Sequence, residues 1–356
     1  MTQELGIVEA RGACSPYIKF DKFCTDGGRY MKKILVVLLV LVMSVTAVGL
    51  FGCNYGPKSD VNVIVPDGAP ALAMVSLFEK DEIAGHKMTY EIVSGDAIVQ
   101  KVSSGAASVA IMPTNAAANL YNKGVDIKLV ATEVQGILYM VGTSTITDYN
   151  ALKGKVVYSI GQGNTPEFVF KYLLTQNGIS ADDIVEGSVA TEGKVTISYQ
   201  SDGSTIIPLL VQGTAEYAIL GEPAATTAKS KKATLVTALD LQAEWAKLND
   251  SASYPQASLV VSGELAQDKA FINALVKAVK ENDQWILNNV DKVNEILATK
   301  GSTLKNLTKG IIESCNIKTV EAKNAKTAVN AYFTVLNTYK PAFIGGKIPS
   351  EEFFLN

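Results

Sequence analysis

Strand-like and helix-like segments alternate along most of this sequence. Short apolar runs typical of buried strands, such as VNVIVP at 61–66 and SVAIMP at 108–113, precede predicted helices at about 70–80 and 114–124. After a further strand, the chain is predicted to be nearly all helical as far as about Tyr339. Alternation over this length predicts an α/β fold with mainly parallel sheets.

Four of the predicted strands run through a short loop of small and polar residues straight into a helix. These junctions read VPDGAPALAM, IMPTNAAANL, SIGQGNTPEF and ILGEPAATTA. In open α/β sheets, ligands bind outside the carboxyl ends of the strands, where helix N-termini present free N–H groups. The four junctions therefore predict one polar binding site, although such turns also occur in α/β proteins for purely structural reasons.

An uncharged stretch of 19 residues, Ile34–Gly52, follows Lys32 and Lys33 and ends at Cys53. This order of positive, apolar and small residues describes a secretory signal peptide, although a membrane span of about 20 residues has a similar length. The closing LFGC resembles the bacterial lipobox, whose cysteine is lipidated, with Phe51 as a departure from that pattern. We expect 31–52 to be a lipoprotein signal peptide, Cys53 to carry lipid, and 53–60 to be a polar tether.

Residues 1–30 have no periodic apolar face. A signal peptide begins a protein, and Met31 stands where such a segment would start. Our hypothesis is that translation begins at Met31 and that 1–30 is a non-native extension.

The charge balance of the chain and its scarcity of histidine and arginine limit the possible functions. The chain has 32 basic and 35 acidic residues and no basic run, so it lacks the electrostatic footprint of nucleic-acid binding. Its only histidine is His86, and its only arginines, Arg11 and Arg29, precede Met31. Histidine-based catalysis, a histidine-rich metal site and a bidentate arginine clamp on an anion are therefore weakened or excluded.

Five segments together resemble the substrate-binding proteins of ABC importers, most closely the nitrate, sulfonate and taurine class with its binders of thiamine-precursor pyrimidines. The segments are VIVPDGAPALAM, AIMPTNAAANLY, LKGKVVYSIGQGNTPEFVFKYLL, AEYAILGEPAAT and FIGGKIPSEEFF. The resemblance spans about Val61 to Leu355. It implies an α/β, two-lobed type 2 periplasmic-binding-protein fold with the ligand cleft between lobes that two crossing strands connect. Lobe 1 would comprise 61–142 plus 253–356, and lobe 2 would comprise 143–252.

The same resemblance implies the partners and the ligand loops. The partners would be a small-molecule solute, an ABC permease with its ATPase, and the membrane through the lipid anchor. The protein would be a monomer without cofactor, metal or catalytic residues. The ligand-binding residues would be Asp67, Gly68, Ala69, Pro70, Thr114, Asn115, Gln162, Gly163, Asn164, Thr165, Glu222 and Tyr254.

The missing arginine departs from the pattern of sulfonate and nitrate binders. Backbone N–H groups and the amide and hydroxyl side chains of the junctions suit a neutral or weakly anionic polar solute. Glu222 would favour a ligand with a donor or a positive end, unless it only stabilises a helix start. The junction loops contain no lysine.

Two other functions stay open. Pyrimidine-synthase relatives share the implied fold but use a histidine-rich site, which one histidine cannot supply. His86 is predicted to be a loop or strand-edge residue, and Cys315, which has no basic neighbour, to be buried packing. A sensor lipoprotein would bind a solute by the same lobe closure as a transport protein.

Overall fold

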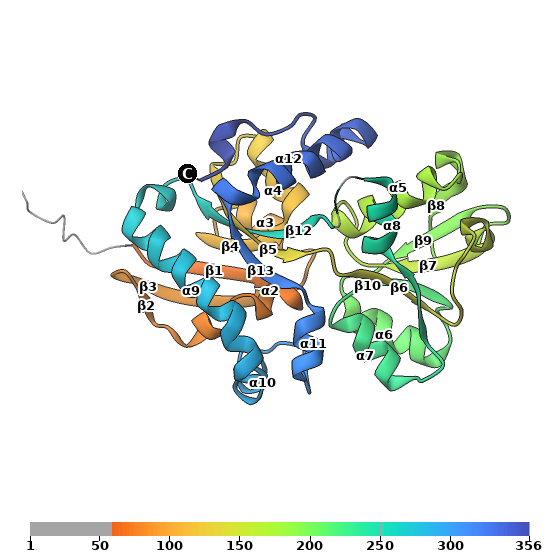
Figure 1. The fold of residues 1–356 in the computed structure, drawn as a ribbon, viewed down its shortest axis with the longest axis horizontal. Coiled ribbons are helices and arrows are strands. Elements are labelled where there is room, and N and C mark those ends of the chain that lie inside the picture. Colours follow the sequence, from red (N-terminus) through yellow and green to blue (C-terminus); the bar gives the residue numbers. More distant parts are fainter. Residues whose placement is uncertain (1–58, 250, 252, 356) are drawn as a thin grey trace, which may run out of the picture. The chain divides into compact units, whose positions relative to one another are not determined.

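The computed structural model describes residues 59–249, 251 and 253–355, so the predicted extension, signal peptide and Cys53 lie outside the described residues. The described strands form two mixed sheets (Figure 1). The first sheet has the order β13-β5-β12-β4-β1-β3-β2. Its strands are β1 (Val61–Pro66), β2 (Glu82–Ile83), β3 (His86–Val93), β4 (Val109–Pro113), β5 (Ile127–Gln135), β12 (Pro255–Ser262) and β13 (Ile317–Glu321).

The second sheet has the order β11-β6-β10-β7-β9-β8. Its strands are β6 (Leu138–Gly142), β7 (Lys155–Ser159), β8 (Ile184–Glu186), β9 (Val195–Tyr199), β10 (Tyr217–Gly221) and β11 (Val236–Asp240). In each sheet a parallel centre, β3-β1-β4 or β10-β7-β9-β8, is extended by antiparallel strands. The carboxyl ends of the parallel strands therefore share one edge of each sheet.

The chain crosses between the sheets twice. It leaves the first sheet after β5, passes through Gly136 and Ile137, and enters β6; it returns between Leu248 and Pro255. The predicted first lobe, 61–142, therefore differs from the sheet boundary, because β6 at 138–142 pairs with β10 and β11. An apolar strand pattern does not reveal which sheet a strand joins, so the predicted boundary assigned β6 to the first lobe although it pairs within the second sheet.

Helices cover both faces of each sheet (Figure 1). Beside the first sheet lie α2 (Ala69–Leu72), α3 (Ile98–Ser103), α4 (Thr114–Asn122), α9 (Lys269–Asn288), α10 (Val290–Thr299), α11 (Lys309–Ser314) and α12 (Ala322–Tyr339). Beside the second sheet lie α5 (Thr165–Gln176), α6 (Gly203–Gln212), α7 (Ala224–Lys231) and α8 (Leu241–Leu248). None of the helices in the described residues is long and apolar enough to cross a membrane.

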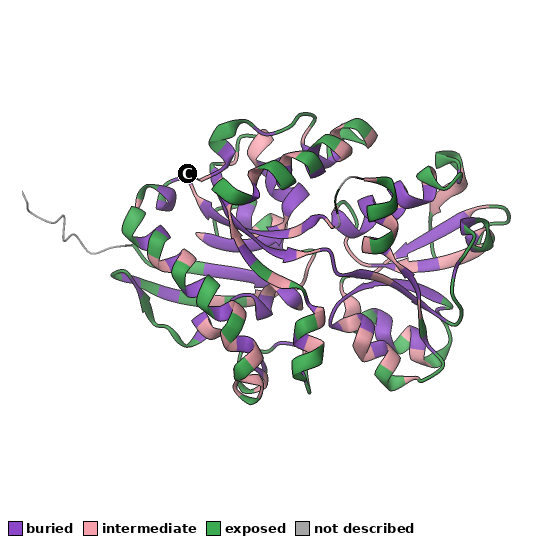
Figure 2. Cartoon of the chain, viewed as in Figure 1, coloured by how far each residue is buried: buried purple, intermediate pink, exposed green. Residues whose placement is uncertain are grey.

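Alternation along the strands divides the core. On β1, Val63 and Val65 pack with α9 and α10, whereas Ile64 faces the cluster that contains α3, α4 and α12. On β10, Ile219 joins that second cluster with α5 and α8, and Leu220 packs against α6 and α7. One apolar cluster thus reaches residues of both sheets, and Figure 2 shows that most strand residues are buried while the helices expose their outer faces.

Two elements differ from the predictions. The helix predicted over 70–80 is a four-residue helix, α2, followed by a 3-10 helix at Val75–Glu79. The buried side chain of Asn282 separates them, because its amide donates to Leu72 O (2.9 Å) and its oxygen accepts from Ser76 N (3.0 Å). The second difference is β13, which lies within the segment predicted to be nearly all helical. Its β-branched sequence, IKTVE, favours a strand.

Candidate functional site

Loops at the carboxyl ends of the parallel strands of one sheet contact those of the other. We call these loops the facing junctions: 67–70, 94–97 and 114–115 beside the first sheet, and 160–165, 200–203 and 222–223 beside the second. The side chain of Asn115 donates to Gly163 O at 3.3 Å. A Cβ atom on Gly95 would lie 3.9 Å from Ser201 O. The junction after β4 therefore meets the one after β7, and the junction after β3 meets the one after β9.

Asn115 is the centre of a buried hydrogen-bond network between these junctions. Its oxygen accepts from Thr165 Oγ1 at 3.1 Å, and its amide nitrogen also donates to Phe343 O at 3.4 Å. Thr165 Oγ1 accepts in turn from the hydroxyl of Tyr332 at 3.2 Å. Asn115 and Thr165 are fully buried. The structure thus brings together two residues that the sequence singled out, but their polar atoms bind each other.

Lys171 of α5 lies next to the junction that precedes this helix. Glu167 accepts from Gly163 N at 2.7 Å and from Lys171 Nζ at 2.8 Å, and Lys171 also binds Glu186 at 3.0 Å. Burial alone would lower the pKa of Lys171, but its hydrogen bonds to both carboxylates outweigh that effect and raise it. The sequence argument considered only lysines within the loops and therefore missed this cation.

Other predicted residues of the facing junctions bind local partners. Gln162 is exposed and donates to Glu186 at 2.9 Å. Asn164 precedes α5 and donates to Gln162 O at 3.3 Å. Thr114, at the start of α4, is buried and shares a 2.8 Å hydrogen bond with Ser258 on β12.

The junction after β1 is held to a distant loop. Asp67 accepts from Ser302 Oγ at 2.5 Å and from both the backbone N and the hydroxyl of Thr303 at 2.8 and 2.6 Å. Gly68 adopts φ 107°, and Ala69 and Pro70 begin the four-residue α2. Asp67 therefore fastens the loop that contains Ser302 in this structure.

Glu222 lies buried at the end of β10 and binds the start of α7. Its two oxygens accept from Thr226 N at 3.0 Å and from Thr226 Oγ1 at 2.9 Å. After burial and the nearby charge of Asp240, the charge of Glu222 contributes to the raised pKa of the Tyr139 phenol. Burial, with a further contribution from Glu222, also raises the pKa of the Cys315 thiol. Glu222 thus both stabilises a helix start and lies near polar groups of β6 and of the loop before β13.

Tyr254 belongs to the return crossing and is buried. Its hydroxyl donates to Gln242 Oε1 at 2.7 Å, and the same Gln242 amide accepts from Leu138 N and donates to Leu138 O. Gly136 leaves the room for this arrangement, because an added Cβ would approach Gln242 Cγ and Ser253 Oγ to 2.8 Å. Gln242, which the sequence analysis did not single out, therefore links the return crossing to the start of β6.

Aromatic side chains of α5, α8, α12 and the segment after α12 pack against one another. The Phe168 ring lies 5.7–6.1 Å from five others, those of Tyr172, Trp245, Tyr332, Tyr339 and Phe343. Trp245 is buried, but its Nε1 has no hydrogen-bond partner among the described residues. This aromatic cluster joins elements of the two sheets next to Thr165 and Tyr332.

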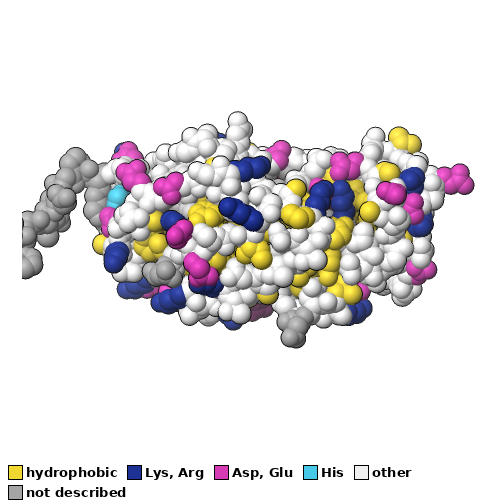
Figure 3. Space-filling view, turned by 90° about the horizontal axis from the view of Figure 1, so that it is seen from above, with side chains coloured by type: hydrophobic (Ala, Val, Ile, Leu, Met, Phe, Trp, Pro, Cys, Tyr) yellow, Lys and Arg dark blue, Asp and Glu magenta, His cyan; other side chains and the backbone are white. Residues whose placement is uncertain are grey.

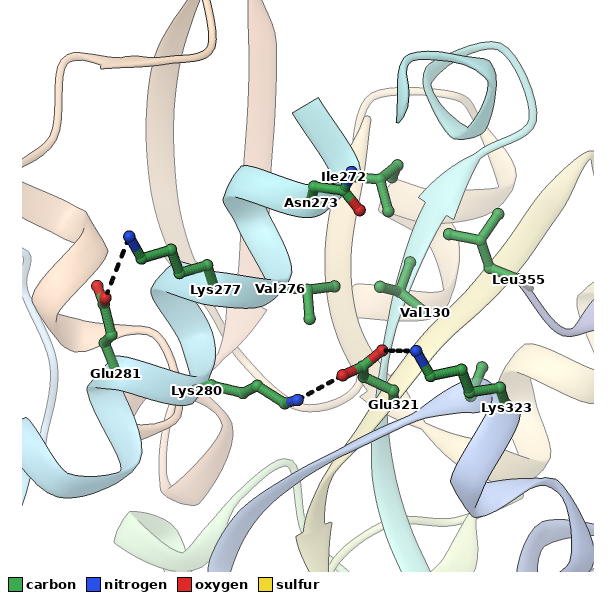
Figure 4. Close-up of a pocket in the computed structure, with 11 residues that line it drawn as sticks. Val130, Ile272, Asn273, Val276, Lys277, Lys280, Glu281, Glu321, Lys323 and Leu355 are labelled. Carbon is green, nitrogen blue, oxygen red and sulfur yellow. Dashed lines mark hydrogen bonds and ion pairs between the residues drawn. The ribbon is translucent and has the colours of Figure 1, made fainter. Parts of the chain in front are cut away.

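A pocket of about 500 Å³ lies elsewhere, beside the first sheet (Figure 4). Its floor includes Val130 and Val276, and its rim includes Lys280, Glu321 and Lys323. The two lysines pair with Glu321. None of the predicted ligand residues lines this pocket, and the described residues hold no group of three acidic, histidine or cysteine side chains that could bind a metal ion.

His86 and Cys315 have structural surroundings. His86 begins β3, is buried, and places its ring nitrogens 2.9 Å from Ser59 O and 3.1 Å from Asp268. Cys315 is fully buried at the end of α11. Both ring nitrogens of His86 therefore have polar partners, and the buried Cys315 thiol donates to Ile311 O at 3.3 Å.

No family model matches the sequence, and no curated protein matches it. Solved structures do match. One is an ABC transporter from Parabacteroides distasonis, with a TM-score of 0.67, 23% identity, and coverage of 84% of this chain and 99% of that chain. Another is the ligand-binding component of an ABC-type import system from Staphylococcus aureus with zinc bound, with a TM-score of 0.59, 13% identity, and coverage of 84% and 97%.

A third similar structure is the periplasmic aliphatic sulphonate binding protein of Escherichia coli. It has a TM-score of 0.57 and 15% identity, and the match covers 83% of this chain and 93% of that one. Matches this long at such low identity show a shared fold. The chain described here therefore has the two-lobed, type 2 periplasmic-binding-protein fold.

Proposed function

We propose that this protein is the extracytoplasmic solute-binding component of an ABC importer. The observation that carries the proposal is the contact between the facing junctions, where Asn115 beside one sheet binds Gly163 and Thr165 beside the other. Residues that touch across two sheets joined by two crossings would lie on opposite sides of a small molecule bound between the sheets. The proteins of similar fold include components of ABC import systems, which supports the same role.

The solute would be neutral or weakly anionic and polar. Lys171, the cation next to the Gly163 junction, is already paired with Glu167 and Glu186, so it leaves little positive charge for a strong anion. Each oxygen of Glu222 has one hydrogen bond, to Thr226, and retains a lone pair for a donor of the solute. A ligand with an amine or another donor would therefore bind better than a fully anionic one.

Glu222→Gln separates the two roles of this residue. Gln can still accept from Thr226, so stability without solute should change little, whereas loss of a buried charged hydrogen bond costs about 2–5 kcal/mol of binding and at least tenfold in affinity. Unchanged affinity would leave Glu222 as a helix-start residue only.

A thermal unfolding screen tests the proposed function. The solutes would be amino acids, pyrimidines, sulfonates and nitrate, each added to the purified protein. A solute at 100 times its Kd should stabilise the protein by about 2.7 kcal/mol. Stabilisation by one solute class supports the proposal, and chemical conversion of a solute by the protein alone would favour the enzyme alternative instead.

The lipid anchor is a further part of the proposal. A lipid on Cys53 would keep the protein beside its permease, and attachment by two or more chains would be stable. Cys53→Ser should abolish diacylation, which mass spectrometry of the detergent fraction would detect; an unlipidated wild-type N-terminus would refute the anchor. Lysine and acidic side chains are both scattered over the face drawn in Figure 3.

Transport and sensing require the same solute site. Permease and ATPase genes beside the gene for this protein would favour import, and their absence would favour the sensor.

A further inference from the structure

Glu133 is an acidic residue inside the first sheet. It lies on β5, three residues before Gly136, where the chain crosses to the second sheet. Its side chain is fully buried, and its Oε1 has no hydrogen-bond partner among the described residues. A buried carboxyl group with one unpartnered oxygen is costly if it is ionised, so its protonation state needs an explanation.

The hydrogen bonds around Thr319 show that one of its two neighbouring carboxyl groups must be protonated. Thr319 Oγ1, on the neighbouring strand β13, lies 2.8 Å from Glu133 Oε2 and 3.0 Å from Asp283 Oδ1 of α9. A hydroxyl group has one hydrogen and can donate one full hydrogen bond. If it donates to one carboxylate, the other carboxyl group must be protonated and donate to the hydroxyl oxygen. Two close carboxylates that both ionise would also repel each other in a buried site.

The surroundings decide which carboxyl group holds the proton. Asp283 is half-buried, accepts a second hydrogen bond from Thr319 N at 2.8 Å, and lies near the positive charge of Lys280. Burial raises the pKa of Asp283, whereas its two hydrogen bonds from Thr319 and the charge of Lys280 oppose that rise. Among the described residues, Glu133 has only the Thr319 hydroxyl as a hydrogen-bond partner, and burial, with the charge of Asp283 as a smaller contribution, raises its pKa well above 4.5. The proton therefore belongs on Glu133.

Three lysines on the elements beside Glu133 pair with other carboxylates. On α9, Lys280 pairs with Glu321 of β13, and Lys277 pairs with Glu281 (Figure 4). Lys323, at the start of α12, pairs with the same Glu321. The other neighbouring strand, β12, and the short helix α2 contain no titratable side chain.

We infer that Glu133 is protonated in the folded protein at neutral pH. The hydrogen-bond relay from Glu133 through Thr319 to Asp283 then links β5 to β13 and α9, and this link depends on the proton of Glu133. The protonated Glu133 donates to Thr319, and Thr319 donates to Asp283. This proton-dependent link stabilises β5, the strand that runs into the first crossing.

The relay sets the direction of a pH effect. In the unfolded chain Glu133 loses its proton above its ordinary pKa of 4.5, whereas the folded protein keeps it to a higher pH. The folded state then binds more protons, so stability falls as pH rises from the ordinary pKa to the raised one and then becomes constant. Most carboxylates that are paired in folded proteins have the opposite effect over acidic pH.

Glu133→Gln in the full chain tests the inference, because a glutamine amide donates to Thr319 at every pH. The melting temperatures of Glu133→Gln and the wild type should be close at pH 5, and the variant should become progressively more stable than the wild type toward pH 9. The control is Glu91→Gln, which removes an exposed carboxylate that pairs with Lys101 at 2.9 Å. That variant should show no gap that widens with pH. If the melting temperature of Glu133→Gln were below that of the wild type by the same amount at every pH, the inference of a proton-dependent link would be wrong.

Carbon-13 NMR of glutamate-labelled wild-type protein gives an answer that does not depend on the folding of Glu133→Gln. One glutamate carboxyl resonance should remain protonated at pH 7, and Thr319→Val should shift that resonance. A spectrum in which every glutamate carboxyl group of the folded protein is ionised at pH 7 would overturn the inference.

Discussion

Replacement of Phe168 by alanine would remove the centre of the aromatic cluster between the elements of the two sheets. Phe168 is fully buried and has five aromatic neighbours, three of which belong to α12 and the segment after it. Truncation of a buried phenylalanine to alanine costs about 3–5 kcal/mol. Because a folded domain is stable by only about 5–15 kcal/mol, this loss would be a large fraction of the total.

Thermal unfolding followed by tryptophan fluorescence measures the effect, because Trp245 packs directly against Phe168. For a loss of this size we expect the melting temperature to fall by about 6–20 °C, at about 2–4 °C per kcal/mol. Val189→Ala, at a side chain that is 76% exposed, is the matched control and should change stability by less than about 0.5 kcal/mol. If Phe168→Ala lost no more stability than Val189→Ala, the aromatic cluster would not join the two sides as we describe.

Three further predictions concern the facing junctions and crossings. Asn115→Ala and Thr165→Val should each cost about 1–3 kcal/mol, and together less than the sum, with a coupling of about 0.5–3 kcal/mol in a double-mutant cycle; additive losses would contradict the shared hydrogen bond. Gly136→Ala should destabilise by about 1–3 kcal/mol through overpacking against Gln242 and Ser253, whereas Gly187→Ala, whose nearest neighbour would be 3.6 Å away, should be nearly neutral; equal effects would refute the close approach. Because burial raises the pKa of Cys315, peptide mapping should find this thiol unlabelled by iodoacetamide at pH 8 in the folded protein and labelled after denaturation; rapid labelling of the folded protein would show that Cys315 is accessible.

The sequence predicted the fold class, because strand periodicity and junction chemistry are local properties. The helix starts at Thr114 and Thr165 and the strand ends before them can be read from apolar runs that meet small and polar residues. The break at Leu72 could not be read locally, because Asn282, more than two hundred residues away, supplies the hydrogen bonds that interrupt the helix. The sheet to which β6 belongs also depends on distant strands.

The candidate site was less predictable than the fold. Sequence position indicated that Asn115 and Thr165 would lie at junctions, but only packing shows that they bind each other. Lys171 and Glu167 have the spacing of an ordinary surface pair, yet Glu167 is buried against the Gly163 junction. For Glu133 a signal was present, since a lone acidic residue within the apolar strand IKLVATEVQ is unusual, but its proton-sharing partners come from β13 and α9.

Isothermal titration calorimetry, combined with chemical analysis of the solute afterwards, tests the proposed function most directly. We predict saturable binding of one solute per protein molecule for one class of neutral or weakly anionic polar solutes, weaker binding by Glu222→Gln, and recovery of the solute unchanged. Conversion of the solute to a product, or the absence of saturable binding by the folded protein for every solute class, would contradict the proposal that this protein is a solute-binding component.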